Sequence, residues 1–181
     1  MSVLCHDGAP QRWRRTGYKL LAGTHRIYVK ISGEWVYLYR AVDREGRTVD
    51  FRLSTKRDVA AAKAFLRKAM KGQGSTPRTI TLDGYAASHR AVCEMKANGQ
   101  LPADTKLRSS KYLNNLIEQD HRGVKLRIGP MLGFKWFRTA AVTIAGIELL
   151  HRIHKDQFNL ARLRLKDRST PAVWNAVLAA Q

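Results

Sequence analysis

Three short β-prone runs joined by two tight turns constrain the fold of this 181-residue chain more than any other feature of its sequence. Residues 27–31 are rich in branched and aromatic side chains, and residues 35–42 (WVYLYRAV) form a longer run of the same kind. A turn at residues 32–33 separates them, and a second turn at residues 44–47 leads into the third run, residues 48–53. Strands joined by tight turns pair antiparallel, so the sequence predicts a three-stranded antiparallel meander.

A helix with one apolar face is predicted directly after the meander. Its apolar residues recur at helical spacing, at Ala62, Phe65, Leu66, Ala69 and Met70. This period buries one side of a helix against a core. Thr55 is the expected N-cap, with Asp58 three residues later in the capping-box position.

Short strands and helices alternate through the rest of the chain. Strands are expected at residues 79–82 and 106–109, and helices at residues 85–97, 112–127, 138–155 and 171–180. Such alternation is typical of parallel strands with helices over the sheet. The predicted fold class is therefore α/β, with a mixed sheet of three antiparallel strands followed by β-α units and flanked by helices.

The charge balance indicates a polyanionic partner. The chain carries 33 Lys and Arg against 14 Asp and Glu, a formal net charge of +19 at pH 7. Hydrophobic residues make up 44% of it, which argues against a wholly disordered basic tail. A surplus of this size favours nucleic acid as the partner over a merely solvated cationic surface.

The sequence pattern is not that of a membrane or secreted protein. The longest uncharged run, residues 169–181, is too short to span a bilayer. The amino end shows no signal-peptide pattern, and two cysteines do not make a disulfide framework. We expect an intracellular protein with no membrane partner.

Two carboxylates stand out in so basic a chain. Asp83 follows the apolar strand 79–82 directly, at the end where open α/β sheets bind their ligands. Glu118 lies within the predicted helix 112–127, on the same face as Arg122 and Lys125, which follow it by four and seven positions. A carboxylate with two cations beside it can hold a magnesium-class ion and a phosphate backbone together.

Spacing alone leaves a structural alternative open for both carboxylates. Asp83 could cap the helix that follows it, and Glu118 could form ordinary pairs with Arg122 one helical turn away.

Five sequence runs resemble the DDE transposases of bacterial insertion sequences, specifically insertion-sequence family six. They are residues 35–43 (WVYLYRAVD), 48–51 (TVDF), 60–69, 111–125 (KYLNNLIEQDHRGVK) and 130–139 (PMLGFKWFRT). The resemblance extends from about Tyr28 to the carboxyl end. It implies a ribonuclease-H-like fold and a triad of two Asp and one Glu that binds two Mg²⁺ (or Mn²⁺) ions. It also implies DNA cleavage at element ends and joining of the freed 3′ hydroxyl to target DNA.

The resemblance assigns roles to five residues of this chain. Asp83 matches the second Asp of the triad and Glu118 matches the Glu, so both are expected to be catalytic and to bind metal. Lys125 matches a basic residue that contacts DNA, and Arg122 and His121 are expected to bind DNA beside it. The implied partners are double-stranded DNA, at element ends and target, and further copies of the chain. The implied location is the bacterial cytoplasm, at the nucleoid.

The first Asp of the family is missing. It belongs to an Asp-Glu-Thr-Tyr segment, and anchoring on Tyr28 and Trp35 puts His25, Arg26 and Ile27 in place of Asp, Glu and Thr. A neutral imidazole supplies no negative charge to a site for hard cations. An alternative function is therefore a truncated, catalytically inactive transposase remnant that only binds DNA.

The domain boundaries follow from the resemblance. Residues 1–26 form a divergent basic segment, residues 27–155 the ribonuclease-H-like DDE catalytic domain, and residues 156–181 a helical tail. Asp43 and Asp50 match family positions outside the triad, so neither is expected to replace the missing Asp.

Three further side chains are expected to have structural roles. Trp136 and Phe137 could stack on bases, because Lys135 and Arg138 flank them, but a hydrophobic anchor is the favoured role. Cys93, within a predicted helix, is expected in the core.

Overall fold

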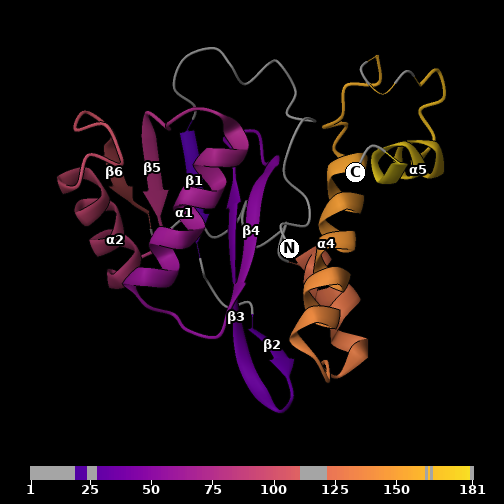
Figure 1. Cartoon of the computed structure of the whole chain (residues 1–181), viewed down its shortest axis with the longest axis horizontal. Coiled ribbons are helices and arrows are strands. Elements are labelled where there is room, and N and C mark those ends of the chain that lie inside the picture. Colours follow the sequence, from indigo (N-terminus) through magenta and orange to yellow (C-terminus); the bar gives the residue numbers. More distant parts are fainter. Residues whose placement is uncertain (1–18, 24–27, 111–121, 162, 164, 180–181) are drawn as a thin grey trace.

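A mixed sheet of six strands forms the centre of the molecule (Figure 1). The computed structural model describes residues 19–23, 28–110, 122–161, 163 and 165–179. The strands are β1 (Lys19–Gly23), β2 (Tyr28–Ile31), β3 (Glu34–Val42), β4 (Thr48–Ser54), β5 (Thr79–Leu82) and β6 (Lys106–Ser109). The helices are α1 (Val59–Gln73), α2 (Ala86–Ala97), α4 (Phe137–His154) and α5 (Thr170–Ala179). Residues 122–128 are also helical, and a 3₁₀ turn follows them at η2 (Gly129–Met131).

The strand order confirms the predicted fold class. β2, β3 and β4 pair antiparallel as the predicted meander, while β1, β5 and β6 run parallel to one another. β1 also pairs antiparallel with β3 and so joins the two halves of the sheet. β1 and β2 pair with different stretches of the same edge of β3. The strand order across the sheet is therefore β4-β3-β1-β5-β6. This order, with three antiparallel strands followed by parallel β-α units, is ribonuclease-H-like.

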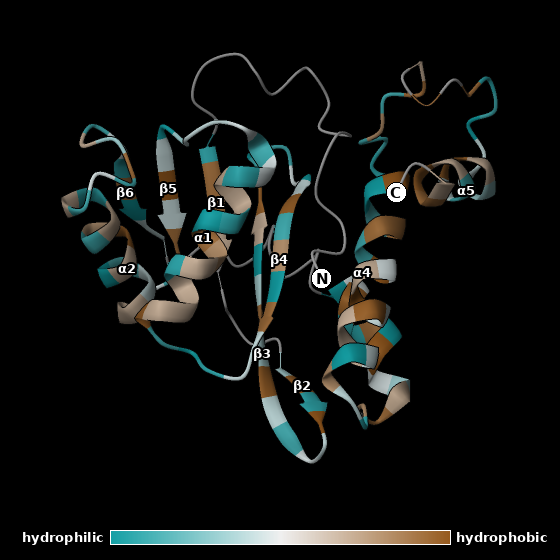
Figure 2. Ribbon diagram, in the orientation of Figure 1, coloured by the Kyte–Doolittle hydropathy of each residue, from teal (hydrophilic) through white to brown (hydrophobic). Residues whose placement is uncertain are grey.

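β1 is a strand that the sequence pattern does not predict. It lies within residues 1–26, where no regular period is visible, yet it occupies the middle of the sheet between β3 and β5. Its Leu20 is fully buried and Ala22 nearly so, and most of the strand carries the hydrophobic colour in Figure 2. Three successive buried residues, Leu20, Leu21 and Ala22, give neither an alternating nor a helical period, so only tertiary pairing reveals such a strand.

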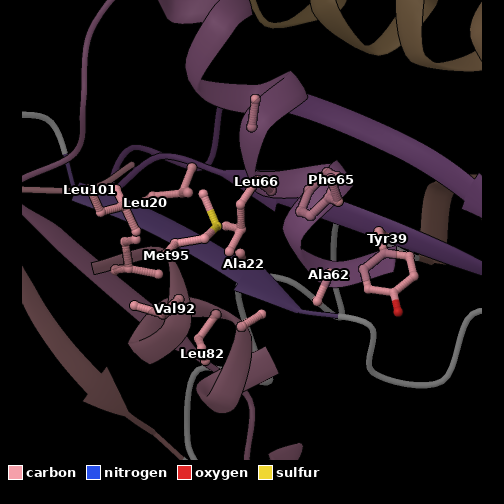
Figure 3. Packing of buried hydrophobic residues seen from close by; sticks show 14 of the residues in the cluster. Leu20, Ala22, Tyr39, Ala62, Phe65, Leu66, Leu82, Val92, Met95 and Leu101 are labelled. Carbon is pink, nitrogen blue, oxygen red and sulfur yellow. The ribbon is translucent and has the colours of Figure 1, made fainter. Parts of the chain in front are cut away.

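Helices cover the sheet on both faces and enclose two apolar cores. The first core lies under α1 and α2, where Leu20, Tyr39, Phe65, Leu66 and Met95 pack together (Figure 3). The second core lies under residues 122–128 and α4, where Val36, Leu38, Val124, Ile128 and Ile144 pack together. Successive residues of β3 point to opposite faces, so this strand contributes to both cores.

The amphipathic helix predicted after the meander is confirmed as α1, with one change at its start. Ala62, Phe65, Leu66 and Ala69 are buried and Met70 packs beside them. The cap is Asp58, not Thr55: its side chain accepts a hydrogen bond from Ala61 N at 2.8 Å. Asp at an N-cap performs this role as well as Thr does, and the helix starts three residues later than predicted.

The prediction that Cys93 lies in the core is wrong. Its side chain is exposed, because the buried residues of α2 are Ser88, Ala91, Val92 and Met95, which leaves Cys93 outside the buried stripe. In the part of the chain that the structure describes, no helix is long and apolar enough to cross a membrane.

Candidate active site at the carboxyl ends of β5 and β6

Asp83 lies where the sequence places it, directly after the buried strand β5. Its residue is 6% exposed, and all four residues of β5 are buried. The backbone oxygen of Asp83 lies 3.0 Å from His89 Nε2 of α2. The alternative role as a helix cap does not apply, because the N-cap of α2 is Tyr85, which makes no side-chain capping bond.

β6 brings the chain to the same edge of the sheet as Asp83. It runs parallel to β5, with Ser109 opposite Leu82, and Ser110 N donates to Leu82 O at 3.1 Å. Residues 111–121 follow at once. Glu118 and His121 fall among them, outside the described residues. Their approach to Asp83 therefore stays a prediction.

The strand position next to Asp83 carries no carboxylate. β1 and β5 are parallel neighbours with Ala22 opposite Leu82, so the next residues along the two strands are Gly23 and Asp83. No residue of β1, whose sequence is KLLAG, has an acidic side chain. His25 and Arg26 lie outside the described residues.

β1 and β2, the two strands that flank position 25, differ by two residues in their register on β3. On β3, Gly23 pairs with Arg40 and Tyr28 pairs with Tyr37. From residue 23 to residue 28 the chain advances five positions, whereas the facing part of β3, from residue 40 to residue 37, advances only three. The register of β2 on β3, continued without a break, would instead place residue 25 opposite Arg40. In the described part of the sheet, Gly23 of β1 is the residue that lies between Arg40 and Asp83.

The described residues do not fit a centre for two divalent ions. Within them, no group of three or more His, Cys, Asp and Glu side chains comes together as a metal site. A two-ion centre needs several carboxylates to neutralise and bridge the ions, and at this edge the described sheet supplies Asp83 alone.

Asp43 and Asp50 have structural roles, in agreement with their place outside the triad. Asp43 is buried after β3 and accepts a hydrogen bond from Arg47 N at 2.6 Å. Burial, and then its hydrogen bond with Glu45, raise the pKa of Asp43 to about 7. Asp50 is buried on β4 and pairs with Lys68 Nζ of α1 at 2.8 Å.

A buried tyrosine lies within the electrostatic influence of Asp83. Burial of Tyr39, followed by the charges of Tyr85, Asp58 and finally Asp83, raises the pKa of its phenol to about 12. Tyr39 therefore stays neutral at physiological pH and can only act there as a hydrogen-bonding group.

Residues 122–128 present their basic side chains to solvent and bury Val124 and Ile128 against the sheet. Arg122 and Lys125 are exposed, whereas Val124 is fully buried and Ile128 nearly so in the second core. This orientation leaves both cations free to meet a large ligand.

A buried polar cluster ties this helical stretch to the sheet. Arg40 of β3 forms an ion pair with Glu148 of α4, with Arg40 Nε 2.8 Å from Glu148 Oε1. Arg40 Nη2 lies 3.4 Å from His151 Nδ1, and Arg127 Nη1 lies 3.2 Å from His151 Nε2. The cluster thus links β3, α4 and residues 122–128 through side chains that are mostly buried.

Gly123 allows the close approach of this stretch to α4. A Cβ atom at position 123 would lie 2.9 Å from His151 Nε2 and 3.0 Å from Cε1. No larger residue fits there unless His151 moves, and His151 is confined between Arg40 and Arg127.

The anchor role expected for Trp136 and Phe137 is wrong. Trp136 is 71% exposed and Phe137 is 44% exposed. Both stand at the amino end of α4, which instead packs through Ala140, Ile144 and Ile147. The sequence could not reveal this, because both rings stand at the start of the helix. The apolar spacing that identifies the buried face begins only after them.

Comparison with known proteins identifies the family. The model of a DDE domain (DDE_Tnp_IS240) matches residues 24–157. The transposase for insertion sequence-like element IS431mec of Staphylococcus aureus is 40% identical over 150 residues, which cover 83% of this chain and 61% of that protein. The S. aureus transposase for insertion sequence element IS257 in transposon Tn4003 matches to the same extent.

The chain spans 61% of the length of these curated relatives. Among solved structures, the HTLV-2 integrase catalytic core domain in complex with magnesium (trimeric form) aligns with a TM-score of 0.48 and 14% identity, over 88% of this chain and 82% of that chain. A likeness this weak adds nothing to the fold that the strand order already shows. With the DDE-domain match over most of the described sheet and helices, the chain belongs to the DDE transposases of bacterial insertion sequences, in insertion-sequence family six.

Proposed function

We propose that this domain acts on double-stranded DNA in transposition, by cleaving strands at element ends and transferring the 3′ end to a target. The observation that carries the proposal is Asp83, a buried carboxylate at the carboxyl end of β5, beside the point where β6 leads into the segment of Glu118. Asp83 and Glu118 are the residues proposed to hold a divalent cation, Mg²⁺ or Mn²⁺. The described donors alone do not complete a two-ion centre.

DNA is held by the basic residues that follow Glu118. Arg122 and Lys125 are exposed on one helical stretch, and His121 precedes them directly. A net charge of +19 supports a phosphate backbone as their ligand. We also propose that the domain works in the cytoplasm at the nucleoid, where its DNA lies, and as a homo-oligomer, because two element ends must be held at once.

One observation favours a second candidate, a catalytically inactive domain that only binds DNA. The position beside Asp83 on β1 is Gly23, and the strand has no carboxylate. A site with one carboxylate fewer neutralises less cationic charge and holds its ions more weakly.

A strand-transfer assay distinguishes the two candidates. The chain is incubated with a labelled, pre-cleaved element end, a target plasmid and Mg²⁺ or Mn²⁺. Asp83→Ala serves as the matched variant, and binding to the same DNA is measured in parallel. Joined product that Asp83→Ala abolishes supports the catalytic function. DNA binding without product, in both proteins, supports the inactive domain, and absence of binding contradicts both.

A further inference from the structure

The β2–β3 hairpin presents one aromatic and basic face to solvent. Lys30 pairs with Trp35, and Tyr28 pairs with Tyr37, so these four side chains share a face of the hairpin. Trp35 is 61% exposed and Tyr28 is 43% exposed. Their rings meet edge-to-face with centroids 6.2 Å apart, and Tyr28 meets Tyr37 in the same way at 5.5 Å. The rings are therefore ordered against one another although they are not covered.

A second exposed segment lies directly beside this hairpin. Phe134 N donates to Lys30 O and Ser32 N donates to Phe134 O, both at 2.8 Å, so the chain before α4 extends the edge of β2. A Cβ atom on Gly133 would lie 2.9 Å from Lys30 O, which shows how tightly the two segments are joined. Trp136 follows two residues after Phe134 and is 71% exposed.

We call the exposed side chains of these two joined segments the aromatic–basic surface, and define it as Tyr28, Lys30, Trp35, Lys135, Trp136 and Arg138. The hairpin turn also holds the second segment directly before Trp136, because Ser32 Oγ donates to Lys135 O at 2.5 Å. Exposed large aromatic side chains that gather on one part of a protein mark a binding site, because single exposed rings need no explanation but a group of them does. What binds there is decided by charge.

The charge around the aromatic rings is almost entirely positive. Residues 122–138 contain five basic side chains and no acidic one, and Lys135 and Arg138 are exposed on either side of Trp136 and Phe137. Within the hairpin, residues 28–37, Glu34 is the single acidic residue. A second copy of the chain would bring two such positive surfaces together, which costs free energy. A polyanion with flat apolar groups has the complementary chemistry.

We propose that the aromatic–basic surface binds an unpaired strand of DNA. Bases stack on the exposed indole of Trp136 and on the Tyr28–Trp35 pair, and the phosphates between them contact Lys30, Lys135 and Arg138. Base stacking requires unpaired nucleotides, since a duplex hides the faces of its bases. The inference rests on the proposed action on DNA and makes it more specific: the domain holds DNA whose end is single-stranded or has lost its pairing.

The test compares one duplex in two forms. Fluorescence anisotropy measures the affinity of the full chain for a blunt 20-bp duplex and for the same duplex with a six-nucleotide thymidine extension at one 3′ end. The wild type is expected to bind the extended form about 5- to 50-fold more tightly, given the contribution of stacking per base. Trp136→Leu, which stays apolar but loses the π-face, is expected to lose most of that preference. Trp136→Phe is expected to keep most of it.

Two further variants separate this inference from the proposed function. Lys125→Ala is expected to weaken binding to both duplexes by the same factor. Leu178→Ala changes an apolar side chain on α5 that is 47% exposed and should alter neither affinity. Circular dichroism and melting temperature check that each variant is folded.

Three outcomes would overturn the inference. Equal wild-type affinity for the two forms, with duplex binding intact, refutes the unpaired-strand site and leaves the proposed action on DNA standing. Failure to bind either form refutes the proposed function as well. A preference that survives Trp136→Leu, together with a fall in molecular mass from dimer to monomer in light scattering, shows that the surface joins two copies of the chain instead.

Discussion

Arg40 and Glu148 form an almost fully buried, two-point ion pair between the sheet and α4. Arg40 Nε lies 2.8 Å from Glu148 Oε1, and Arg40 Nη2 donates to Glu148 Oε2 at 2.8 Å. The same Nη2 donates to Thr48 Oγ1 at 3.1 Å. The main-chain partner of Arg40 on β1 is Gly23, so a single strand, β1, lies between the strand of Arg40 and the strand that leads to Asp83. The ion pair holds α4 against the sheet near the candidate site.

Loss of one member of this pair should be costly. Glu148→Ala leaves the Arg40 guanidinium buried without its carboxylate, and the free energy of unfolding is expected to fall by about 3–5 kcal/mol. Urea denaturation measures it. The ion pairs of Glu94 are far less buried and provide the control, since Glu94→Ala should change stability far less. The double variant Arg40→Met with Glu148→Leu should recover most of the loss, and a double variant no more stable than Glu148→Ala would contradict this reading.

Gly123→Ala should destabilise the fold even though alanine favours helices. The new Cβ would meet His151 Nε2 at 2.9 Å, and such overpacking costs about 1–3 kcal/mol, against a gain of about 1 kcal/mol in helix propensity. Thermal unfolding should show a lower Tm. Adding His151→Ala removes the clash, so the double variant should lose less than the two single losses added together. Simple additivity would show that the two residues do not interfere.

The stability of the wild type should fall as pH rises from about 4 to 7, through Asp43. Burial and the Glu45 hydrogen bond raise its pKa from 3.8 to about 7 in the folded protein. The folded state therefore binds more protons than the unfolded state over this range. The contribution of Asp43 to the free energy of unfolding is fully present below its unfolded pKa and is lost as pH rises through its folded pKa. Over this range the free energy of unfolding falls by at most about 1.4 kcal/mol per pH unit.

Asp43→Asn isolates this effect, because an amide oxygen can still accept the hydrogen bond from Arg47 N. The difference in unfolding free energy between wild type and variant should shift in favour of the variant as pH rises to 8. Glu45, whose pKa is lowered mainly by the same hydrogen bond, adds an opposite trend below its usual pKa. Parallel pH profiles for the two proteins would show that Asp43 does not titrate in this range.

Binding to duplex DNA should depend steeply on salt. Each phosphate that a cation neutralises releases counterions, so the logarithm of affinity falls linearly with the logarithm of salt concentration. Lys125→Ala should weaken binding modestly and reduce that slope by about one unit. Anisotropy titrations at several salt concentrations measure both. Affinity that ignores salt would rule out phosphate contacts as the source of binding.

Gly23→Asp should increase the affinity for Mn²⁺, because the register of β1 and β5 places residue 23 beside Asp83. Calorimetry or Mn²⁺ paramagnetic resonance measures the gain, and Asp83→Ala in the same background should remove it. The triple change His25→Asp, Arg26→Glu and Ile27→Thr restores the family motif and is the natural comparison. A gain from the triple change alone would place the first carboxylate position at residue 25, not at residue 23.

The sequence predicts the meander, α1 and the position of Asp83 because each depends on local chemistry. Alternation, turn residues and helical spacing are all visible within a window of a dozen residues. β1 is missed because its burial comes from partners on β3 and β5. The exposure of Trp136 is missed for a related reason: which rings are covered depends on how α4 packs, and not on the residues beside the rings.

At the candidate site, residue chemistry and family resemblance together predict the absence of the first carboxylate. The sequence alone places the gap at His25, by counting back from Tyr28. The structure adds the two-residue offset between β1 and β2, which a residue count cannot detect because it assumes an unbroken strand.

The parallel pairing of β1 with β5 has a consequence for folding order. Lys19 and Thr79 are partners although sixty positions (79 minus 19) separate them, whereas the strands of the meander are joined by turns and can pair early. The pairing of β1 with β5 is therefore expected to form late, because β1 meets β3 over only 21 positions (42 minus 21). Until it forms, β1 and β5 each have an open edge, and open edges recruit strands from other molecules. We expect aggregation of this protein to be governed by the time that this central pairing takes to form.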